Sequence, residues 1–436
     1  MGTDALKRTL IFLLAAAALA VRPAAATGSR ASALAGASDF VLDDSQIHAW
    51  PCRAPLYYRA LIAELGVDGS RVSDQSSVAG YYSDQERSLG VIGLAVNRRT
   101  AAQEALAGYI RRTYVTAGVS AQANIIERFK LRAGGRGAGL RHIPAPGGGI
   151  ELSYARSFGD WTPGLRIERS RAEDSENITG SAGEASAGVT GVTLSAGYQP
   201  RDGLRADAAL EYAGHSFSSR FTLDAAGYEE RLEADAARTI GARARAFYSL
   251  GDEMTLVPRL ALERSTLGYA YSQSDTGRGA AGTMTATDFA LGAGWLYSPN
   301  PRYTVIAAAD LGYAAATVAD SLVVGDPGDV KSVSKTWTVP AVHLGLETQL
   351  TRWLAARIGG SKRISSTEIV TDYSTGEAKT VRRTSDSYRL GCGLGFRIGG
   401  FALDLAVNPE VLYSGGNVLS GSKTWPVSQV SMIYRY

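Results

Sequence analysis

The sequence predicts an all-β fold, a transmembrane antiparallel β-barrel of about 14 strands with an N-terminal plug, or hatch. Three observations lead to this prediction: an alternating final strand, a regular series of alternating runs before it, and an export signal. Successive side chains of a strand point to opposite faces, so one face of a barrel wall meets lipid and the other a wet lumen. The mean hydropathy of the 436-residue chain is −0.06, near neutral, as expected for such a wall.

The final strand alternates almost without error over residues 426–436 and ends on an aromatic residue. Apolar side chains fill one face and polar ones the other, with Ile433 as the exception: Val430, Met432, Tyr434 and Tyr436 against Gln429, Ser431 and Arg435. This ending resembles the last strand of bacterial outer-membrane proteins. We expect it to pair with the first strand, because an open edge in lipid leaves backbone groups without partners.

The start of the chain has the pattern of a secretory signal peptide over residues 1–26. Lys7 and Arg8 precede an apolar run at 10–21, and three alanines at 24–26 form a cleavage site before Thr27. The alternative is an uncleaved anchor. No later run approaches the roughly 18 to 20 apolar residues of a membrane helix. Export combined with alternating strands predicts an outer-membrane location, and a net charge of +3 gives no reason to expect nucleic acid as a partner.

Thirteen alternating runs follow one another from residue 150 onward. Short turns rich in Gly, Pro and Asp alternate with longer polar connections; examples of the short turns are 159–160, 251–252 and 399–400. Short periplasmic turns that alternate with long extracellular loops are typical of outer-membrane barrels. The long connections are expected at about 172–187, 214–235, 267–285, 317–335, 366–384 and 414–425.

The direction of the final strand constrains the number of strands. The last run must descend to the periplasm, so the run at 150–158 also descends, and an odd number of strands must precede residue 150. Candidates lie at 56–65, 86–98 and 122–132; one of them gives fourteen strands and all three give sixteen. We expect fourteen, with 86–98 first, and a helix within 101–115 in a large first loop.

Residues 27–85 would then form the hatch and 86–436 the barrel. The interval before residue 86 is rich in apolar and aromatic residues, which favours a segment folded into the lumen over the alternative of a loose periplasmic tail.

Several residues of this interval resemble the N-terminus of outer-membrane proteins of the FadL/TodX type. A small-residue stretch at 32–38 precedes the acidic pair Asp43 and Asp44, and Pro51 follows, with Trp50 and Cys52 where the family has Asn and Ala. The resemblance implies a hatch-plugged, fourteen-stranded barrel for passive uptake of hydrophobic small molecules such as long-chain fatty acids. It also implies hatch roles for Asp43, Asp44, Trp50 and Pro51.

The resemblance further implies that the ligand lands in an extracellular apolar groove and passes to an internal pocket. The candidate ligand-binding residues are Phe40, Ile47, Trp50, Phe217, Phe221 and Tyr269; for the last three the alternative is simple loop packing. Basic lumen residues could meet a ligand carboxylate: Arg166, Arg205, Arg243, Arg245, Arg259, Arg357, Arg389 and Arg397. The alternative, which we expect for most of them, is mutual neutralisation with the lumen acids Glu168, Asp207, Glu211, Glu263, Asp310, Glu347 and Asp404.

No catalytic or metal site is expected. His343 belongs to the polar face of its run, with no serine partner in the pattern, His215 has no acidic partner, and no metal-ligand spacing occurs. Cys392 fits a small apolar position, and a bond between it and Cys52 stays open. We expect a monomer without cofactors, whose partners are the ligand, outer-membrane lipids and the barrel assembly machinery. Alternative functions are a structural or adhesive surface barrel and an autotransporter with a short passenger before twelve strands.

Overall fold

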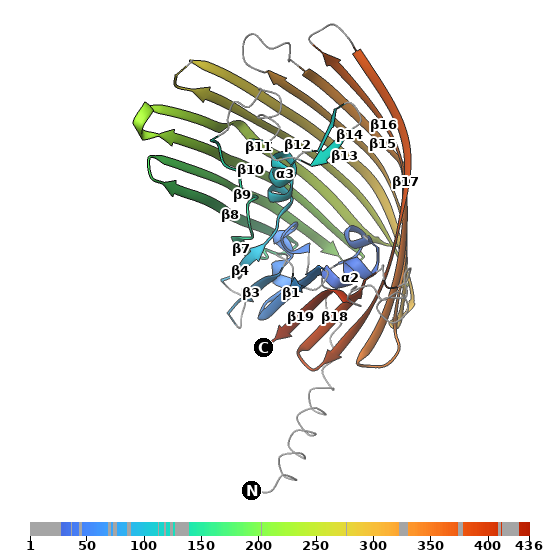
Figure 1. Ribbon diagram of the computed structural model, residues 1–436. Helices are drawn as coiled ribbons and strands as arrows, with labels where there is room; N and C mark the ends of the chain where they lie inside the picture. The colour runs from blue at the N-terminus through green and yellow to red at the C-terminus, as the bar shows by residue number, and fades with distance from the viewer. Residues whose placement is uncertain are drawn as a thin grey trace, which may run out of the picture.

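The computed structural model is a closed antiparallel β-barrel (Figure 1). It describes residues 28–35, 37–42, 46–68, 71–72, 76–84, 89–111, 113–116, 119–122, 125–126, 139–201, 203–275, 277–321, 330–373, 378–408, 411 and 427–436. The main sheet has 17 strands, but β2 (Arg71–Val72) pairs only with β1 (Ala60–Asp68), so sixteen strands make the wall. The last strand, β19 (Val427–Arg435), pairs with β1 and closes the barrel.

Strand length divides the wall into two unequal parts. Six neighbouring strands around the closure have 6 to 9 residues each: β18 (Phe401–Val407), β19, β1, β3 (Ser77–Tyr82), β4 (Val91–Arg98) and β7 (Gly149–Ala155). The other ten have 18 to 23 residues: β8 (Trp161–Ile178), β9 (Ser181–Arg201), β10 (Leu204–Leu223), β11 (Tyr228–Ser249), β12 (Met254–Gln273), β13 (Arg278–Asn300), β14 (Tyr303–Ser321), β15 (Val330–Gln349), β16 (Leu354–Tyr373) and β17 (Ala378–Ile398).

The structure confirms the alternative count of sixteen strands, and the expected fourteen is wrong. Three wall strands, β1, β3 and β4, precede residue 149, so the odd number and the thirteen later runs are confirmed. The third of the three, β4, lies within 86–98, which is therefore not the first strand. Of the interval 122–132, Gln122 ends a strand, Val119–Gln122, that pairs with Thr113–Thr116 in a separate sheet, and residues 123–124 and 127–132 lie outside the described chain.

The early strands also correct the boundary of the expected hatch. Strands β1 and β3 belong to the wall, so the interval 27–85 is not one plug. Both strands are short and carry small residues such as Ala63 and Gly80, which gives a weak apolar pattern. Backbone pairing with β19 on one side and β4 on the other places them in the wall.

Most of the expected extracellular loops are strand. The pairing of β8 with β9 continues to Ile178 and Ser181, and that of β10 with β11 to Leu223 and Tyr228. Beyond the lipid both faces of a strand meet water, so the apolar stripe ends while the backbone ladder continues. The long first loop, at 99–148, is confirmed, and it contains the expected helix, α3 (Ala101–Ile110).

The outer surface of the barrel carries the apolar belt of a membrane protein. Large apolar side chains stand exposed there, including Leu291, Leu311 and Leu344. Aromatic pairs mark its borders: Trp161 with Tyr198 at the periplasmic end, 4.4 Å between ring centroids, and Tyr313 with Trp337 at the extracellular end, 4.5 Å apart. This architecture is that of an outer-membrane protein. Among the described helices, none is long and apolar enough to cross a membrane.

The exception in the final strand has a structural reason. Ile433 points inward, where it is 2% exposed in an apolar cluster with Ala60 and Ala402. Its neighbour Ser431 is also inward and fully buried, whereas Tyr434 and Tyr436 are half exposed on the outer face. Where β19 closes the barrel, the inner face is therefore apolar at Ile433, near the periplasm, and polar at Ser431, the next inward residue.

The two cysteines lie on opposite sides of the wall and are free. Cys392 alternates with the inward Gly391 and Gly393 of β17 and so faces outward, as the apolar position predicted. Cys52 is buried inside the barrel. The possible disulfide between them does not form.

Candidate functional site

The N-terminal segment, which we define as the described part of residues 28–57, packs against the inner face of the wall. It consists of α2 (Gly28–Ala33) and two 3-10 helices, Ala37–Phe40 and Pro51–Tyr57, joined by short links. Figure 1 shows α2 inside the lower end of the barrel, near the carboxyl terminus. The alternation of wall residues places the side chains that touch this segment on the inner face.

Inward glycines of the wall receive the backbone of the segment. A Cβ added at Gly359 would lie 2.4 Å from the carbonyl carbon of Leu34, and one at Gly391 would lie 2.4 Å from the carbonyl oxygen of Ser32. The same holds at Gly164, where the nearest atom would be the backbone nitrogen of Cys52 at 2.3 Å. Only a residue without a side chain fits these positions, so the inner wall is shaped to the segment.

A chain of ions ties α2 to the wall. Arg30 Nε and Arg357 Nε both donate to the same oxygen of Glu347, at 2.6 Å each, and Arg357 Nη1 donates to Asp404 at 2.5 Å. The Arg357 side chain is 0% exposed. A buried guanidinium is tolerated only when carboxylates surround it, so Glu347 holds both the wall and the segment in place.

A second ionic cluster holds the other end of the segment. Asp207 pairs with Arg53 of the segment and, at 3.0 Å, with Arg245 of β11. The Arg245 guanidinium also stacks over the Trp50 ring, 4.7 Å from its centroid. Nearby, His48 Nδ1 lies 2.7 Å from Glu151.

The expected neutralisation of lumen charges is confirmed for most of the wall. Arg166 lies 3.4 Å from Glu168 and 3.6 Å from Glu211, and Arg259 lies 2.8 Å from Asp310. His343 also contacts Asp310, at 3.2 Å, as a lumen polar residue. The segment therefore sits in a lumen that is already charge-balanced at the periplasmic end.

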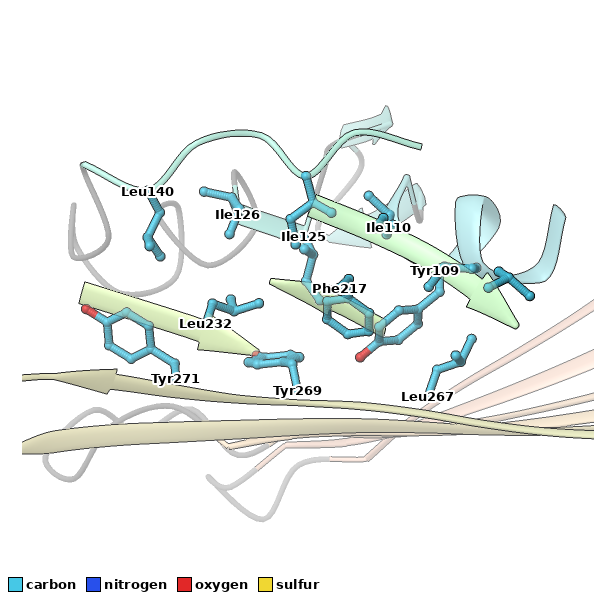
Figure 2. Packing of buried hydrophobic residues seen from close by; sticks show 14 of the residues in the cluster. Tyr109, Ile110, Ile125, Ile126, Leu140, Phe217, Leu232, Leu267, Tyr269 and Tyr271 are labelled. Atoms are coloured by element: carbon cyan, nitrogen blue, oxygen red, sulfur yellow. The ribbon is translucent and has the colours of Figure 1, made fainter. Parts of the chain in front are cut away.

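The first extracellular loop fills part of the opposite end of the lumen. Thr100 caps α3. Its hydroxyl accepts a hydrogen bond from the backbone N–H of Gln103, and the Gln103 side-chain oxygen accepts one from the backbone N–H of Thr100. Leu106, Tyr109 and Ile110 of this helix are buried against inward residues of four long strands (Figure 2). The wall side of this lumen cluster consists of Ala187, Val189, Ala213, Phe217, Leu232, Leu267, Tyr269 and Tyr271.

Arg141 fastens the same loop to the rim. Its guanidinium lies 2.8 Å from Asp174 and also pairs with Glu176, both on β8. Its backbone nitrogen donates to Ser219 Oγ at 3.1 Å, and that hydroxyl donates back to the Arg141 carbonyl at 3.0 Å. The acids beside it raise the pKa of Arg141 through hydrogen bonding and charge, so it stays a cation.

A cavity of about 380 Å³ lies between the N-terminal segment and the long strands. Trp50 borders it on the segment side, and Arg243, Glu263, Asp310 and Arg363 are among its wall residues. It touches both the paired charges of the periplasmic half and the strands that continue to the extracellular end.

The candidate ligand residues fall into two separate groups. Phe217 and Tyr269 are buried in the lumen cluster, and Phe221 packs at its edge. Phe40 lies in the N-terminal segment beneath Arg259, 4.9 Å from ring centroid to guanidinium, while Ile47 packs below with Tyr57. The extracellular and periplasmic groups belong to separate apolar clusters.

The hatch candidates are only partly visible. Trp50 borders the cavity, and Pro51 touches the wall at Gly164. Asp43 and Asp44 lie outside the described residues. Arg30 and the receiving glycines were not among the candidates, because a glycine in an alternating run gives no sign of what packs against it.

The described residues contain no group of three or more side chains suited to a metal ion. His215 Nε2 lies 2.9 Å from Thr239 Oγ1, which in turn lies 2.8 Å from Ser265. No carboxylate in the described chain hydrogen-bonds this histidine, whose Nδ1 is without a partner. His215, Thr239 and Ser265 therefore lack the acidic group that orients a catalytic histidine.

Comparison with known proteins gives likeness of fold. No protein family matches the sequence, and neither does any curated protein. Similar solved structures include the toluene transporter TodX of Pseudomonas putida, at 13% identity, covering 95% of this chain and 99% of that one with a TM-score of 0.39.

Two further solved structures show how broad this likeness is. A FadL homologue of Pseudomonas aeruginosa has 10% identity, coverage of 94% and 99%, and a TM-score of 0.36. The ferric yersiniabactin uptake receptor FyuA of Yersinia pestis has 12% identity, coverage of 80% and 68%, and a TM-score of 0.38. Likeness of this degree assigns no cargo to the chain.

Cys52 provides a test of the docked segment. Burial, and then the Asp207 carboxylate, raise the pKa of this thiol to about 11 from an ordinary value of 9.0. In a Cys392→Ala protein, labelling of Cys52 by iodoacetamide at pH 9 should be slow in the native protein and fast after denaturation, because the docked thiol is buried and holds its proton. The docked thiol keeps a proton that the freed thiol loses, so docking should weaken as pH rises between these values. Rapid labelling of the native protein at pH 8 would contradict a docked segment.

Proposed function

We propose that this barrel serves the passive uptake of hydrophobic small molecules across the outer membrane, with long-chain fatty acids as the expected cargo. The observation that carries the proposal is the lumen cluster. The interior of a pore for hydrophilic solutes is polar, whereas here Phe217, Leu267 and Tyr269 present an apolar inner surface beneath the first loop. Such a surface attracts an apolar compound by the same burial that holds the loop.

The N-terminal segment acts in this proposal as a hatch. Ion pairs of Arg30, His48 and Arg53 join it to the wall. Apolar side chains of the segment, among them Leu34 and Phe40, are also buried against inward wall residues. Displacement of the segment would open the route to the periplasm, and an apolar ligand that takes the place of these side chains would offset part of the cost of exposing the inward wall residues.

The proposal is tested by binding and uptake of a radiolabelled long-chain fatty acid. Saturable binding to purified protein is expected, and Phe217→Asn should weaken it about tenfold, because an amide replaces an apolar ring in the cluster. Leu210→Ala on the same strand should leave binding unchanged, since Leu210 faces lipid at 63% exposure. A fatty acid carrying a photoreactive alkyl chain should label peptides of β9–β12, which keeps the test valid if Phe217→Asn disturbs the fold.

Two outcomes would overturn the proposal. Rapid passage of sugars without fatty-acid binding would indicate an open pore. Binding of a host surface by intact cells, with no uptake, would favour the adhesive alternative. The autotransporter alternative required a twelve-stranded barrel, and the wall has sixteen strands.

A further inference from the structure

The inner face of β16 and β17 carries a set of basic side chains that differs from the rest of the lumen. On both strands the odd-numbered residues face inward, because Gly359 and Gly391 receive the N-terminal segment and the pairing runs without a shift from Leu354 to Asp372. Arg363, Lys379, Arg383 and Arg389 therefore point into the extracellular half of the lumen, and all four are exposed there.

Among the described residues of β16 and β17, no acid stands on the extracellular half of this face. The acidic residues of the same stretch, Glu368, Asp372 and Asp386, have even numbers and face outward. Arg382 and Lys362 also face outward and pair with two of them, at 2.8 Å and 3.5 Å. None of the four inward bases has an acidic partner within the described chain, in contrast to Arg166, Arg245 and Arg357 nearer the periplasm.

Hydroxyl groups surround these bases. Arg363 is the pairing partner of Ser387, and Arg389 that of Ser361, so the two guanidinium groups stand diagonally across neighbouring strands. On the next strand Thr336 and Thr338 hydrogen-bond across to Thr367 and Ser365, at 2.9 Å and 3.3 Å. Hydroxyls alone would keep this wall wet, whereas four unneutralised cations give it a positive potential that concentrates anions.

The basic face and the lumen cluster belong to different parts of the same lumen. The cluster lies on β9–β12 and α3, and the bases lie on β16 and β17. Arg363 and Thr338 also border the cavity that reaches Trp50 of the N-terminal segment. The side of the lumen formed by β9–β12 thus suits an alkyl chain, and the side formed by β16 and β17 suits a charged oxygen group.

We infer that the inner face of β16 and β17, centred on Arg363 and Arg389, binds the anionic headgroup of an amphiphile whose alkyl chain occupies the apolar side. Guanidinium groups hold two oxygens of one carboxylate or phosphate at once, which fits either headgroup. The inference rests on the proposed uptake function and adds that headgroup charge decides which hydrophobic compounds bind.

The test compares dodecyl phosphate, dodecanoate and dodecanol on the purified full-length protein in neutral detergent. Both anions should bind about tenfold more tightly than dodecanol, and added salt should remove the difference. The double variant Arg363→Gln/Arg389→Gln should bind all three probes equally. The matched variant Lys362→Gln/Arg382→Gln, on the same strands but the outer face, should keep the preference.

Three results would overturn the inference. Equal affinities in the unaltered protein would remove the headgroup site, as would an equal loss in the outer-face variant. Inorganic phosphate that binds as tightly as dodecyl phosphate would show a site for free anions with no part for the alkyl chain. If dodecanol binds and only the preference is missing, uptake of hydrophobic compounds stands; if none of the alkyl probes binds, the proposed function itself fails.

Discussion

Replacing Gly359 with leucine is expected to expel the N-terminal segment from the lumen while the barrel stays closed. The new Cβ would lie 2.4 to 2.7 Å from three backbone atoms of Leu34, which cannot rotate away as a side chain could. Overpacking of this kind costs roughly 1 to 3 kcal/mol. If that cost falls on docking, labelling of Cys52 in a Cys392→Ala background should accelerate about 10- to 100-fold. Uptake of the cargo should rise with it.

The adjacent Gly360 supplies the control. It lies on the same strand but faces outward, and a Cβ there would lie 3.3 Å from the flexible end of Leu390 and in ordinary contact, at 3.9 Å, with the Arg389 carbonyl oxygen. Gly360→Leu should label like the unaltered protein. Equal, slow labelling of both variants would show that the segment is not held at this face. For each variant, the shift in gel mobility between unheated and heated samples reports whether the barrel is folded.

Removing the carboxylate of Glu347 should have the largest effect on stability. Glu347→Ala leaves Arg357, whose side chain is 0% exposed, with only Asp404, and leaves Arg30 without the carboxylate it bonds. Breaking a buried ion pair from one side costs about 3 to 5 kcal/mol. We expect a lower unfolding temperature and a looser segment, measured by thermal melting and by Cys52 labelling.

A double-mutant cycle separates the two roles of Glu347. Arg30→Ala removes the contact with the segment and leaves the wall pair intact, so it should accelerate labelling with little change in melting. Adding Arg30→Ala to Glu347→Ala should then accelerate labelling less than it does alone. Strictly additive effects on labelling would mean that Arg30 and Glu347 do not act together.

The sequence allowed the wall from residue 149 onward to be predicted because each long strand alternates charge and apolar bulk. A slip of one residue would put residues such as Asp310 or Arg357 into lipid, at about 2 to 4 kcal/mol for arginine. Strand β3 offered no such contrast: its six residues, Ser77–Tyr82, include no charge and point only two buried side chains inward. The preference for fourteen strands followed from that missing contrast.

The candidate site was harder to predict for a different reason. Phe217 and Tyr269 could be selected as apolar residues among polar ones, but nothing local shows that a helix from residues 101–110 covers them. The bases of β16 and β17 are recognisable as inward by alternation, yet their lack of acids depends on which neighbours face the same way. Both features, the covered lumen cluster and the basic face, depend on contacts between distant parts of the chain.

The course of the chain from the N-terminal segment into the wall also constrains how the molecule can fold. Residue 57 ends the last helix of the segment, and β1 starts three residues later by pairing Ala60 with Arg435 of the final strand. Ser29 of the segment meanwhile hydrogen-bonds Ser431, at 2.7 Å between the hydroxyl oxygens. The seam of the barrel and the seat of the segment thus join the two extremes of the chain, the contacts of greatest sequence separation and slowest formation. Assembly would therefore end with one event, in which the final strand meets both β1 and the N-terminal segment.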